Sequence, residues 1–340
     1  MRNKIQILLK SHMNRICRFS ALLFLLIPQP SYLIPGSATA AEYPSRPIRL
    51  VVPFPAGGSI DIVARAVSLR WSAQLGQQLV IDNRGGAAGA IGTQLVAQAP
   101  ADGYTLLYGN LGPLSIGPHL TPAGYDIFRD FAPVSQVTSS PFMVFASATL
   151  PVANAKELIA HARERPGQLN YASSGVGSGL HLAAELFQNV AGVKFLHVPF
   201  KGMGQAAPEI ASGRVQLAVS TVPGVLPHVK AGRMKGIVSS GTRRSAQLPD
   251  IQTCTEAGLA GFCSSAWHAV VAPARTPKPV IAKIQRTLMT TLASQELRDQ
   301  LLRLEDADRV GSTPEELAKF LRSESAKWSR IIREVGVKAE

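Results

Sequence analysis

Three stretches of the sequence combine glycine with side chains that bind anions or transfer protons: "PAGGSID" (55–61), "RGGAAGAIG" (84–92) and "YASSGVGSGLH" (171–181). Glycine leaves backbone N–H groups unshielded by a Cβ atom, and a helix that begins at such a turn adds the positive end of its dipole. The serines of the third stretch add hydroxyl donors. All three stretches are therefore candidate binding sites for an anion.

The same stretches also permit two enzymatic interpretations, which fit the residues less well. A dinucleotide fingerprint needs G-x-G-x-x-G, whereas "GGSID" lacks the third glycine and the second stretch offers G-x-x-G-x-x-G from Gly86. A phosphate-binding loop needs a Gly-Lys pair, which the sequence does not contain. A nucleophile elbow needs G-x-S-x-G, but Ser178 is flanked directly by glycines. An exported α/β hydrolase or nucleotide-dependent enzyme acting on a small anion remains the alternative, and we predict no catalytic residues.

Histidine and cysteine do not indicate a metal site or a cofactor. The histidines at 119, 181, 197, 228 and 268 are widely spread, so we expect most of them to be structural. Cys254 and Cys263 are the cysteines that remain if the N-terminus is removed, and in an oxidising compartment they suggest a disulfide. A pair of buried thiols is the alternative, and metal binding is the weakest interpretation because no Cys-x-x-Cys spacing is present.

The N-terminus has the pattern of a secretory signal peptide. Five basic residues and no acidic ones precede the apolar run "FSALLFLLI" (19–27), and Ala38-Thr39-Ala40 fits the cleavage pattern. Nine apolar residues are too few for a membrane span, which needs about 20. We therefore predict a signal peptide over 1–40, cleavage near Ala40 and a periplasmic protein. Its removal reduces the formal charge of +13 by five, and the remaining basic residues are scattered, which argues against nucleic acid.

The candidate stretches must be positioned by strands and helices. Strand-like segments at 48–54, 78–84 and 104–110 alternate with helix-like segments at 59–75 and 91–99, which predicts a parallel sheet built from βαβ units. In such a sheet, turns at the carboxyl ends of strands bind ligands. The pattern begins again after 131–147. We expect two α/β lobes, 41–139 plus 241–340 and 140–240, with mixed or parallel central sheets and a ligand cleft between them.

The sequence resembles the substrate-binding proteins of tripartite tricarboxylate transporters, also called the Bug family after Bordetella uptake genes. The resemblance runs from about residue 43 to the C-terminus. It rests on "YPSRPIRLVVPFPAGGSIDIVAR", "IDNRGGAAGAIG", "APADGYTLLYGN", "NYASSGVGSGLHLAAELF", "HVPFKG", "LPHVKAGR" and "LPDIQTCTEAGLAGF". It implies a type II periplasmic binding protein fold, an organic carboxylate as ligand, the transporter's membrane permease as partner, and no cofactor. We expect a monomer.

The resemblance also implies a set of ligand-binding residues. Those from the first lobe are Phe54, Ala56, Gly57, Gly58, Ser59, Asp61, Gly86, Ala87 and Gly89. Those from the second lobe are Ser173, Ser174, Gly177, Ser178 and His181. Asp61 has an alternative role, since an acid in the first turn of a helix interacts favourably with the helix dipole.

Three positions depart from the family pattern. Ser220 stands where many members carry an acid, "CTEAG" replaces the common "VxEAG", and Cys263 replaces the residue that usually follows "GLPGF". The first departure leaves the ligand class open among mono-, di- and tricarboxylates, amino acids and aromatic acids. The cysteines suggest a local covalent link.

Overall fold

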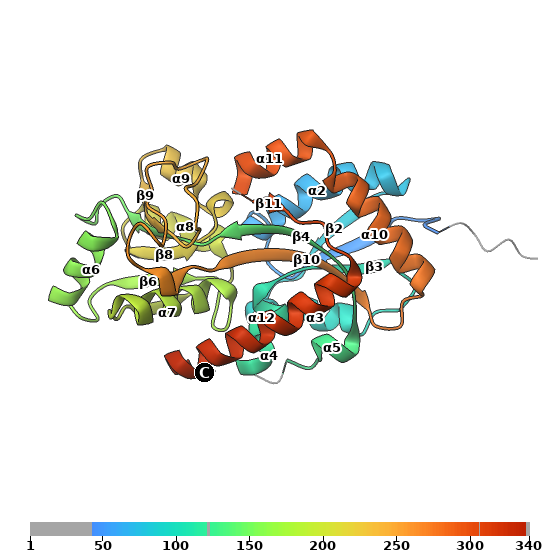
Figure 1. The fold of residues 1–340 in the computed structure, drawn as a ribbon, viewed down its shortest axis with the longest axis horizontal. Coiled ribbons are helices and arrows are strands. Elements are labelled where there is room, and N and C mark those ends of the chain that lie inside the picture. The colour runs from blue at the N-terminus through green and yellow to red at the C-terminus, as the bar shows by residue number, and fades with distance from the viewer. Residues whose placement is uncertain (1–42, 121–122, 306, 338–340) are drawn as a thin grey trace, which may run out of the picture. The chain divides into compact units, whose positions relative to one another are not determined.

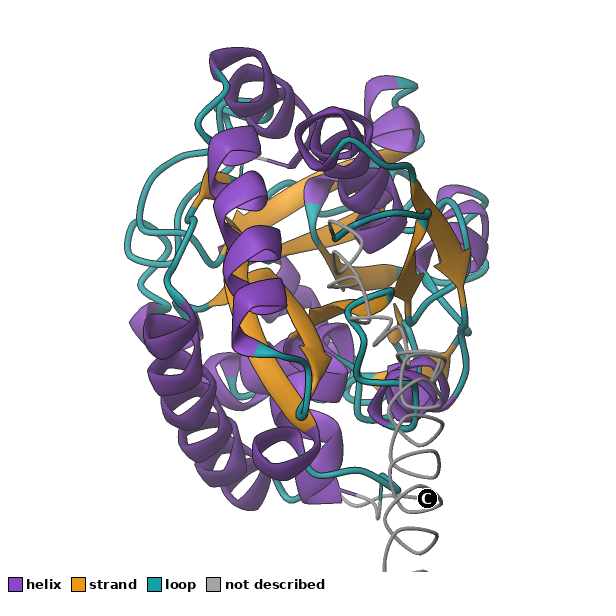
Figure 2. Cartoon of the chain, turned by 90° about the vertical axis from the view of Figure 1, so that its right-hand side faces the viewer, coloured by secondary structure: helices purple, strands orange, loops and turns teal. Residues whose placement is uncertain are grey.

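The computed structural model describes residues 43–120, 123–305 and 307–337. The predicted signal peptide (1–40) and its cleavage near Ala40 lie outside the described residues. Strands in the described residues form two mixed sheets with helices packed on them, which confirms the predicted α/β class. Figure 2 shows the strands enclosed between helices.

Within the described residues, the first sheet has six strands in the order β11-β4-β10-β3-β1-β2. β1 pairs in parallel with β2 and β3, whereas β10 is antiparallel to β3 and β4. The strands are β1 (Ile48–Val52), β2 (Leu79–Asn83), β3 (Thr105–Asn110), β4 (Phe131–Pro141), β10 (Ser265–Pro273) and β11 (Asp308–Arg309). The βαβ units predicted over 48–110 are confirmed.

Helices cover both faces of this sheet, and Figure 1 shows α2, α10 and α11 on one side of β4 and β10 with α3 and α12 on the other. Alternate residues of β1 face opposite sides of the sheet. Leu50 belongs to the apolar core beneath α2, α10 and α11, and Val51 belongs to the core beneath α3 and α12. The helices are α2 (Ser59–Leu75), α3 (Ala90–Ala97), α4 (Gly117–Leu120), α5 (Ile127–Asp130), α10 (Lys278–Leu292), α11 (Gln295–Glu305) and α12 (Pro314–Val335).

The second sheet has five strands in the described residues, in the order β7-β6-β8-β5-β9. β6 is parallel to β7 and β8, and β5 is antiparallel to β8 and β9. The strands are β5 (Met143–Ser147), β6 (Asn170–Ser173), β7 (Leu196–Pro199), β8 (Leu217–Ser220) and β9 (Met234–Ser239). The helices are α6 (Ala155–Glu164), α7 (Gly179–Ala191), α8 (Met203–Ala211) and α9 (Leu226–Lys230).

The apolar stripe predicted for the first helix is buried in α2. Its members have at most 5% of their surface exposed: Ile60, Val63, Ala64, Val67 and Trp71. The indole N–H of Trp71 donates to Thr287 Oγ1 of α10 at 3.0 Å, so the one polar atom of this buried side chain is satisfied. This packing fixes α2 and therefore the position of its N-terminal turn.

The chain crosses between the two sheets twice. β4 leads through Phe142 directly into β5, and β9 ends at Ser239 and is followed by the segment 240–264, which leads back into β10. β4 and β10 pair along their length as the two long central strands in Figure 1. The end of β4 and the start of β10 therefore lie side by side.

Helix α12 lies on the side of β4 and β10 opposite to α10 (Figure 1). Thr313 and Glu316 form a capping box, and Pro314 occupies the first helical position. Glu324 Oε2 accepts hydrogen bonds from the indole N–H groups of Trp267 and Trp328, both at 3.0 Å. A single buried carboxylate thus orients one tryptophan of β10 and one of α12.

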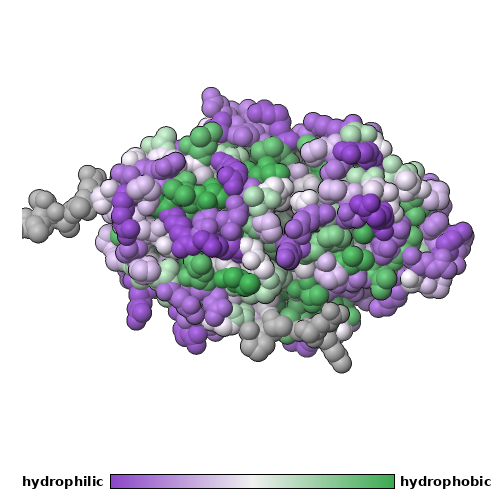
Figure 3. Space-filling view, turned by 180° about the vertical axis from the view of Figure 1, so that it is seen from behind, coloured by the Kyte–Doolittle hydropathy of each residue, from purple (hydrophilic) through white to green (hydrophobic). Residues whose placement is uncertain are grey.

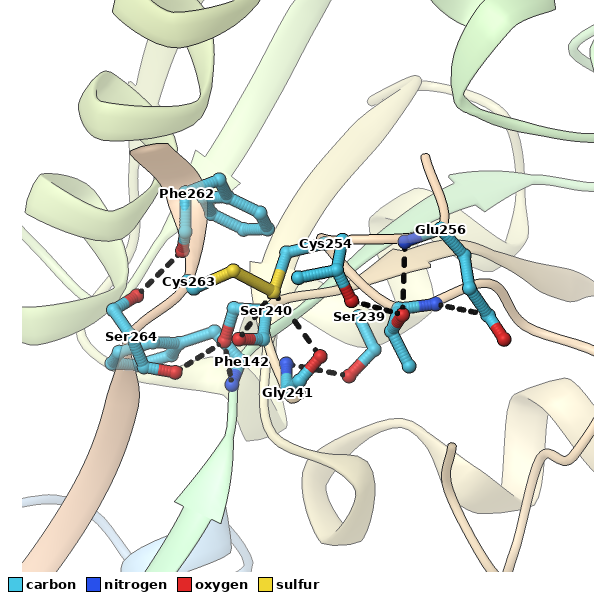
Figure 4. The surroundings of a disulfide bond; sticks show 11 residues. Phe142, Ser239, Ser240, Gly241, Cys254, Glu256, Phe262, Cys263 and Ser264 are labelled. Carbon is cyan, nitrogen blue, oxygen red and sulfur yellow. Dashed lines mark hydrogen bonds between the residues drawn. A yellow bond between two sulfur atoms is a disulfide. The ribbon is translucent and has the colours of Figure 1, made fainter. Parts of the chain in front are cut away.

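Cys254 and Cys263 are joined by a disulfide, and their Cα atoms lie 5.5 Å apart (Figure 4). Cys254 is fully buried. The bond closes the second half of the 240–264 segment, whose residue Ser240 is hydrogen-bonded to Phe142 and Ser264. The disulfide therefore lies where the two crossings meet.

Among the helices that the structure describes, none has the length and apolar content of a membrane span. On the face shown in Figure 3, hydrophobic side chains form separate patches interrupted by hydrophilic ones.

We predict that removing the disulfide destabilises the protein without preventing folding. Closing a loop of about ten residues contributes about 2.5–3 kcal/mol in the chain-entropy description. The double variant Cys254→Ala with Cys263→Ala should lose about that much free energy of unfolding in a urea titration. Reduced wild-type protein is the control and should show the same loss. An unchanged unfolding midpoint in both samples would contradict the prediction.

Candidate functional site

The N-termini of three helices from the two sheet layers converge on one cavity of about 60 Å³. α2 begins after Gly58, α7 begins after Ser178, and α8 begins after Gly202. The first turn of a helix has N–H groups without intrahelical acceptors, and here three such turns line one cavity. The lining residues from these turns are Gly58, Ser59, Ile60, Gly179, Leu180, Gly202 and Met203.

Two of the three helices have no side chain that caps their first turn. Neither Gly58 nor Gly202 provides a capping hydrogen bond, whereas the Ser178 hydroxyl accepts from the N–H of His181. The backbone donors of α2 and α8 at the cavity are thus left for a ligand or solvent. Three positive dipole ends at one cavity make a strong anion site.

Polar side chains complete the lining at Asn110, Ser174, Thr221 and His268. Asn110 Oδ1 is buried and has no hydrogen-bond partner among the described residues. A buried polar atom without a partner is costly, so this side chain is suited to a ligand or a bound water. Asn110 lies at the end of β3, at the same sheet edge as the turn after β1.

The rest of the wall is apolar, and no lysine or arginine among the described residues lines the cavity. Phe54, Leu111 and Phe142 contribute to it, and Trp267 presents its ring because its N–H is held by Glu324. An anion bound here would be held by N–H groups and hydroxyls, and the attached carbon atoms would contact aromatic and aliphatic side chains.

The two glycines of the first turn have different conformations. Gly57 has φ +82°, which favours glycine, and its N–H donates to Asp61 Oδ2 at 2.9 Å. Gly58 has φ −79°, and a Cβ atom there would meet only Pro55 O, at 3.7 Å. The turn therefore requires glycine at 57 for its backbone, whereas a side chain at 58 would have room and would enter the cavity lining.

Asp61 stabilises the turn before α2 through hydrogen bonds. Its carboxylate accepts hydrogen bonds from the Gly57 N–H, from Arg65 and from Asn83, and only 2% of the residue is exposed. Burial alone would raise the pKa of Asp61, but the hydrogen bonds from Arg65, Gly57 and Asn83 lower it below its ordinary value. Asp61 is therefore an ionised group that holds the turn, and it lies outside the cavity lining.

An adjoining cavity of about 310 Å³ brings together the two other glycine-rich loops. Gly86 and Ala87 line it from the first sheet layer, and Gly177 and Lys201 line it from the second. Ala87 and Ala88 have φ of 46° and 51°, a region that L-residues adopt rarely and at some cost. Such strain in a loop beside a cavity is typical of ligand-binding loops.

The structure thus divides the predicted site residues into three groups. Phe54, Gly58, Ser59 and Ser174 line the first cavity, and Ser174 also joins Gly86, Ala87 and Gly177 in the second. The remaining residues lie outside both linings: Ala56, Gly57, Asp61, Gly89, Ser173, Ser178 and His181. Gly89 fits tightly against the Phe54 ring, where a Cβ atom would lie 3.2 Å from Cε2.

Sequence analysis missed several lining residues, notably Asn110, Thr221, Met203 and His268. Two of these had a usable signal, since Asn110 ends the strand "YTLLYGN" and Met203 follows the glycine of "HVPFKG". Strand ends at the ligand-binding edge of a sheet are the positions at which such residues are expected. Among the described residues, no group of three or more His, Cys, Asp or Glu side chains is placed to hold a metal ion.

Two stacked histidines hold the serine–glycine loop before α7. The His181 and His197 rings are 4.2 Å apart between centroids, with the Tyr171 ring stacked on His197. His181 Nδ1 accepts the N–H of Gly177 at 3.1 Å, and His197 Nε2 lies 2.7 Å from Ser173 Oγ. Burial lowers the pKa of both histidines to about 4, so both are neutral near pH 7.

Comparison with known proteins identifies similar chains. Residues 63–337 match the family described as "Tripartite tricarboxylate transporter family receptor". Protein BugT of Bordetella pertussis is 35% identical over 307 residues, covering 90% of this chain and 94% of BugT.

Two solved structures share the fold along most of their length. Periplasmic binding protein BugD has a TM-score of 0.83 and 32% identity, covering 88% of this chain and all of that one. R. palustris Rpa4515 with adipate has a TM-score of 0.84 and 34% identity, covering 87% and 99%.

We predict that the stacked histidines make the protein acid-sensitive. Because the folded-state pKa values are lowered to about 4, the unfolded chain binds protons below about pH 6.5 that the folded protein does not. Stability should be complete above about pH 6.5 and should fall as the pH falls toward 4. The melting temperature between pH 7 and pH 4 measures this loss.

The variant His181→Asn keeps a hydrogen-bond acceptor near Gly177 but cannot be protonated, so its melting temperature should fall less steeply with acid. His197 and His268, whose pKa values burial lowers to about 4 and about 3, remain in this variant and should leave a residual slope. An identical slope in wild type and variant would mean that His181 does not contribute.

Proposed function

The chain belongs to the tripartite tricarboxylate transporter receptor family, and from this membership we propose that it is a periplasmic solute-binding protein. In this proposal it captures a small organic carboxylate and delivers it to the membrane permease of such a transporter. The proposal includes a monomeric protein without catalytic activity.

One observation carries the proposal, namely the convergence of the α2, α7 and α8 N-termini on a cavity lined by no lysine or arginine. A carboxylate has two oxygens that each accept more than one hydrogen bond, which suits several N–H donors from different helices. Interaction with a helix N-terminus contributes about 0.3–1 kcal/mol at exposed sites and up to about 2 kcal/mol when partly buried.

The adjoining cavity suggests how a longer ligand would lie. Ser174 lines both cavities, and Lys201 in the second offers a charge for a distant polar group. Adipate, with which R. palustris Rpa4515 was solved, has two carboxylates joined by four methylenes. We therefore favour a ligand with one carboxylate at the three helix N-termini and an apolar middle against Phe54 and Trp267.

We propose that 43–139 with 241–337 and 140–240 act as two lobes that close over the ligand. A contact between the two proposed lobes supports this proposal, since the Gly224 N–H donates to Ser59 Oγ at 3.0 Å. A Cβ atom at Gly112 would lie 3.2 Å from the Gly179 N, which indicates similarly close approach at α7. Ligand release would require these contacts to separate.

The alternative of a serine hydrolase is disfavoured by the serine–histidine geometry. Ser178 Oγ accepts from the His181 N–H as a helix cap, and His181 Nδ1 is occupied by Gly177. The closer pair, Ser173 and His197, does not line either cavity, and Ser173 is fully buried. Neither serine is placed to attack a bound substrate.

We predict that adipate or another organic acid stabilises the mature protein in a thermal-shift screen. A ligand present at 100 times its Kd adds about 2.7 kcal/mol to the free energy of unfolding. Adipamide is the matched control, because it keeps the carbon chain and removes both charges. A shift with nucleotides and none with any carboxylate would favour the exported-enzyme alternative.

The variant Gly58→Val tests the first turn. Its side chain should occupy the cavity and lower the affinity for the best acid at least tenfold, about 1.4 kcal/mol by calorimetry. The ligand-free melting temperature should change little, because the backbone of Gly58 suits any residue. Gly57→Ala is the matched contrast and should lower the melting temperature, since φ is +82° there. A Gly58→Val protein with unchanged affinity would contradict the proposed site.

A further inference from the structure

A separate polar cavity of about 380 Å³ lies where the chain crosses between the two sheets. Three segments of the two crossings contribute to it: Ser139–Pro141 from the end of β4, 240–245 after β9, and 263–265 at the start of β10. Asp308 of β11 and Lys327 of α12 complete the lining. It shares no lining residue with the proposed carboxylate site or the cavity adjoining it. We call it the hinge cavity.

The crossings are held close together around this cavity. Ser240 donates its hydroxyl to Ser264 O at 2.6 Å and accepts the Phe142 N–H at 2.9 Å (Figure 4). A Cβ atom at Gly241 would lie 3.1 Å from Pro141 Cβ, so the backbones approach as closely as glycine permits. Cys263, which also lines the cavity, is fixed by the disulfide.

Hydrogen-bond donors outnumber acceptors among the side chains of the hinge cavity. Arg243, Arg244 and Lys327 line it, against the single carboxylate of Asp308. Each cation has an acidic partner: Arg243 pairs with Asp308 at 2.6 Å, Arg244 with Glu256 at 3.0 Å, and Lys327 with Glu324 at 3.2 Å.

The acidic partners of Arg243, Arg244 and Lys327 do not use all the N–H donors of these side chains. A guanidinium has five N–H donors and an ammonium has three. Arg243 donates to Asp308 through Nη2, and Lys327 donates to Glu324 Oε1. Glu324 is already shared with two tryptophans, and Glu256 also accepts the Thr253 N–H. The lining cations therefore retain donors that their partner carboxylates do not use.

A second and independent feature is the hydroxyl of Ser140. The residue is 3% exposed, lines the cavity, and its Oγ has no hydrogen-bond partner among the described residues. A buried hydroxyl without a partner destabilises the folded protein unless a ligand or water satisfies it. The hydroxyl and the surrounding cations together match the oxygens of a small tetrahedral anion, which accepts several donors at once.

We propose that the hinge cavity binds a small inorganic oxoanion of the phosphate or sulfate type. The anion would accept the Ser140 hydroxyl and the free donors of Arg243 and Lys327. Because these groups come from β4, from the segment after β9 and from α12, the bound anion would connect the crossing segments. This site is independent of the proposed carboxylate function.

Calorimetric titration of the mature protein with inorganic phosphate, and separately with sulfate, tests the proposal at constant ionic strength. Both anions should bind, and Arg243→Gln should weaken binding at least tenfold. Arg214→Gln removes the same charge from a comparable exposed pair with Glu209 and should leave binding unchanged. Lack of binding by both anions, or equal losses in the two variants, would overturn the proposal.

Ser140→Ala separates a binding role from a folding role. Removing an unsatisfied buried hydroxyl should leave the ligand-free melting temperature equal or higher, while the stabilisation by phosphate should fall. Gly58→Val controls for binding at the carboxylate site and should retain phosphate affinity. Loss of phosphate binding in Gly58→Val, with retention in Ser140→Ala, would place the anion in the carboxylate site and refute the hinge site.

Discussion

The proposed carboxylate site depends on one constraint: among the residues that the structure describes, its lining has no lysine or arginine. Backbone N–H groups then have to supply the donors, and they converge only if several helices begin at the same place. The turn before α2 comes from the first sheet, and the turns before α7 and α8 come from the second. Each follows the carboxyl end of a strand, so both sheets must present that edge to the cavity.

Three titratable or hydroxyl side chains predicted to bind ligand instead stabilise the turns around the cavity, and these three lie outside the cavity linings. Asp61 holds the Gly57 N–H, His181 holds the Gly177 N–H, and Ser178 caps α7. Each satisfies a donor next to the cavity and so fixes the conformation of a turn. Neutral histidines suit this role, because an imidazolium nitrogen could not accept the Gly177 N–H.

The elements that carry the site could be predicted because their signals are local. The stripe from Ile60 to Trp71 has helical spacing, and the capping box at Thr313 marks where α12 begins. Glycine turns after strands located two of the three convergent helices. Thr221 and His268 could not be predicted as lining residues, because their place in the cavity depends on how distant strands meet. The direction of Asp61 was likewise undecided, since an acid at this position suits both a ligand and a helix dipole.

A backbone site also explains how ligand class can change without a change of fold. The family resemblance implies an acid at the position of Ser220, whose hydroxyl donates to the carbonyl of its neighbour Thr221. At the end of β8, Thr221 therefore lines the cavity and Ser220 adds no negative charge. A carboxylate here would attract an amino group and repel a second carboxylate, whereas a hydroxyl tolerates either. In the proposed site, discrimination between ligands would thus depend on a few side chains at strand ends, while the helix N-termini proposed to bind the carboxylate would stay the same.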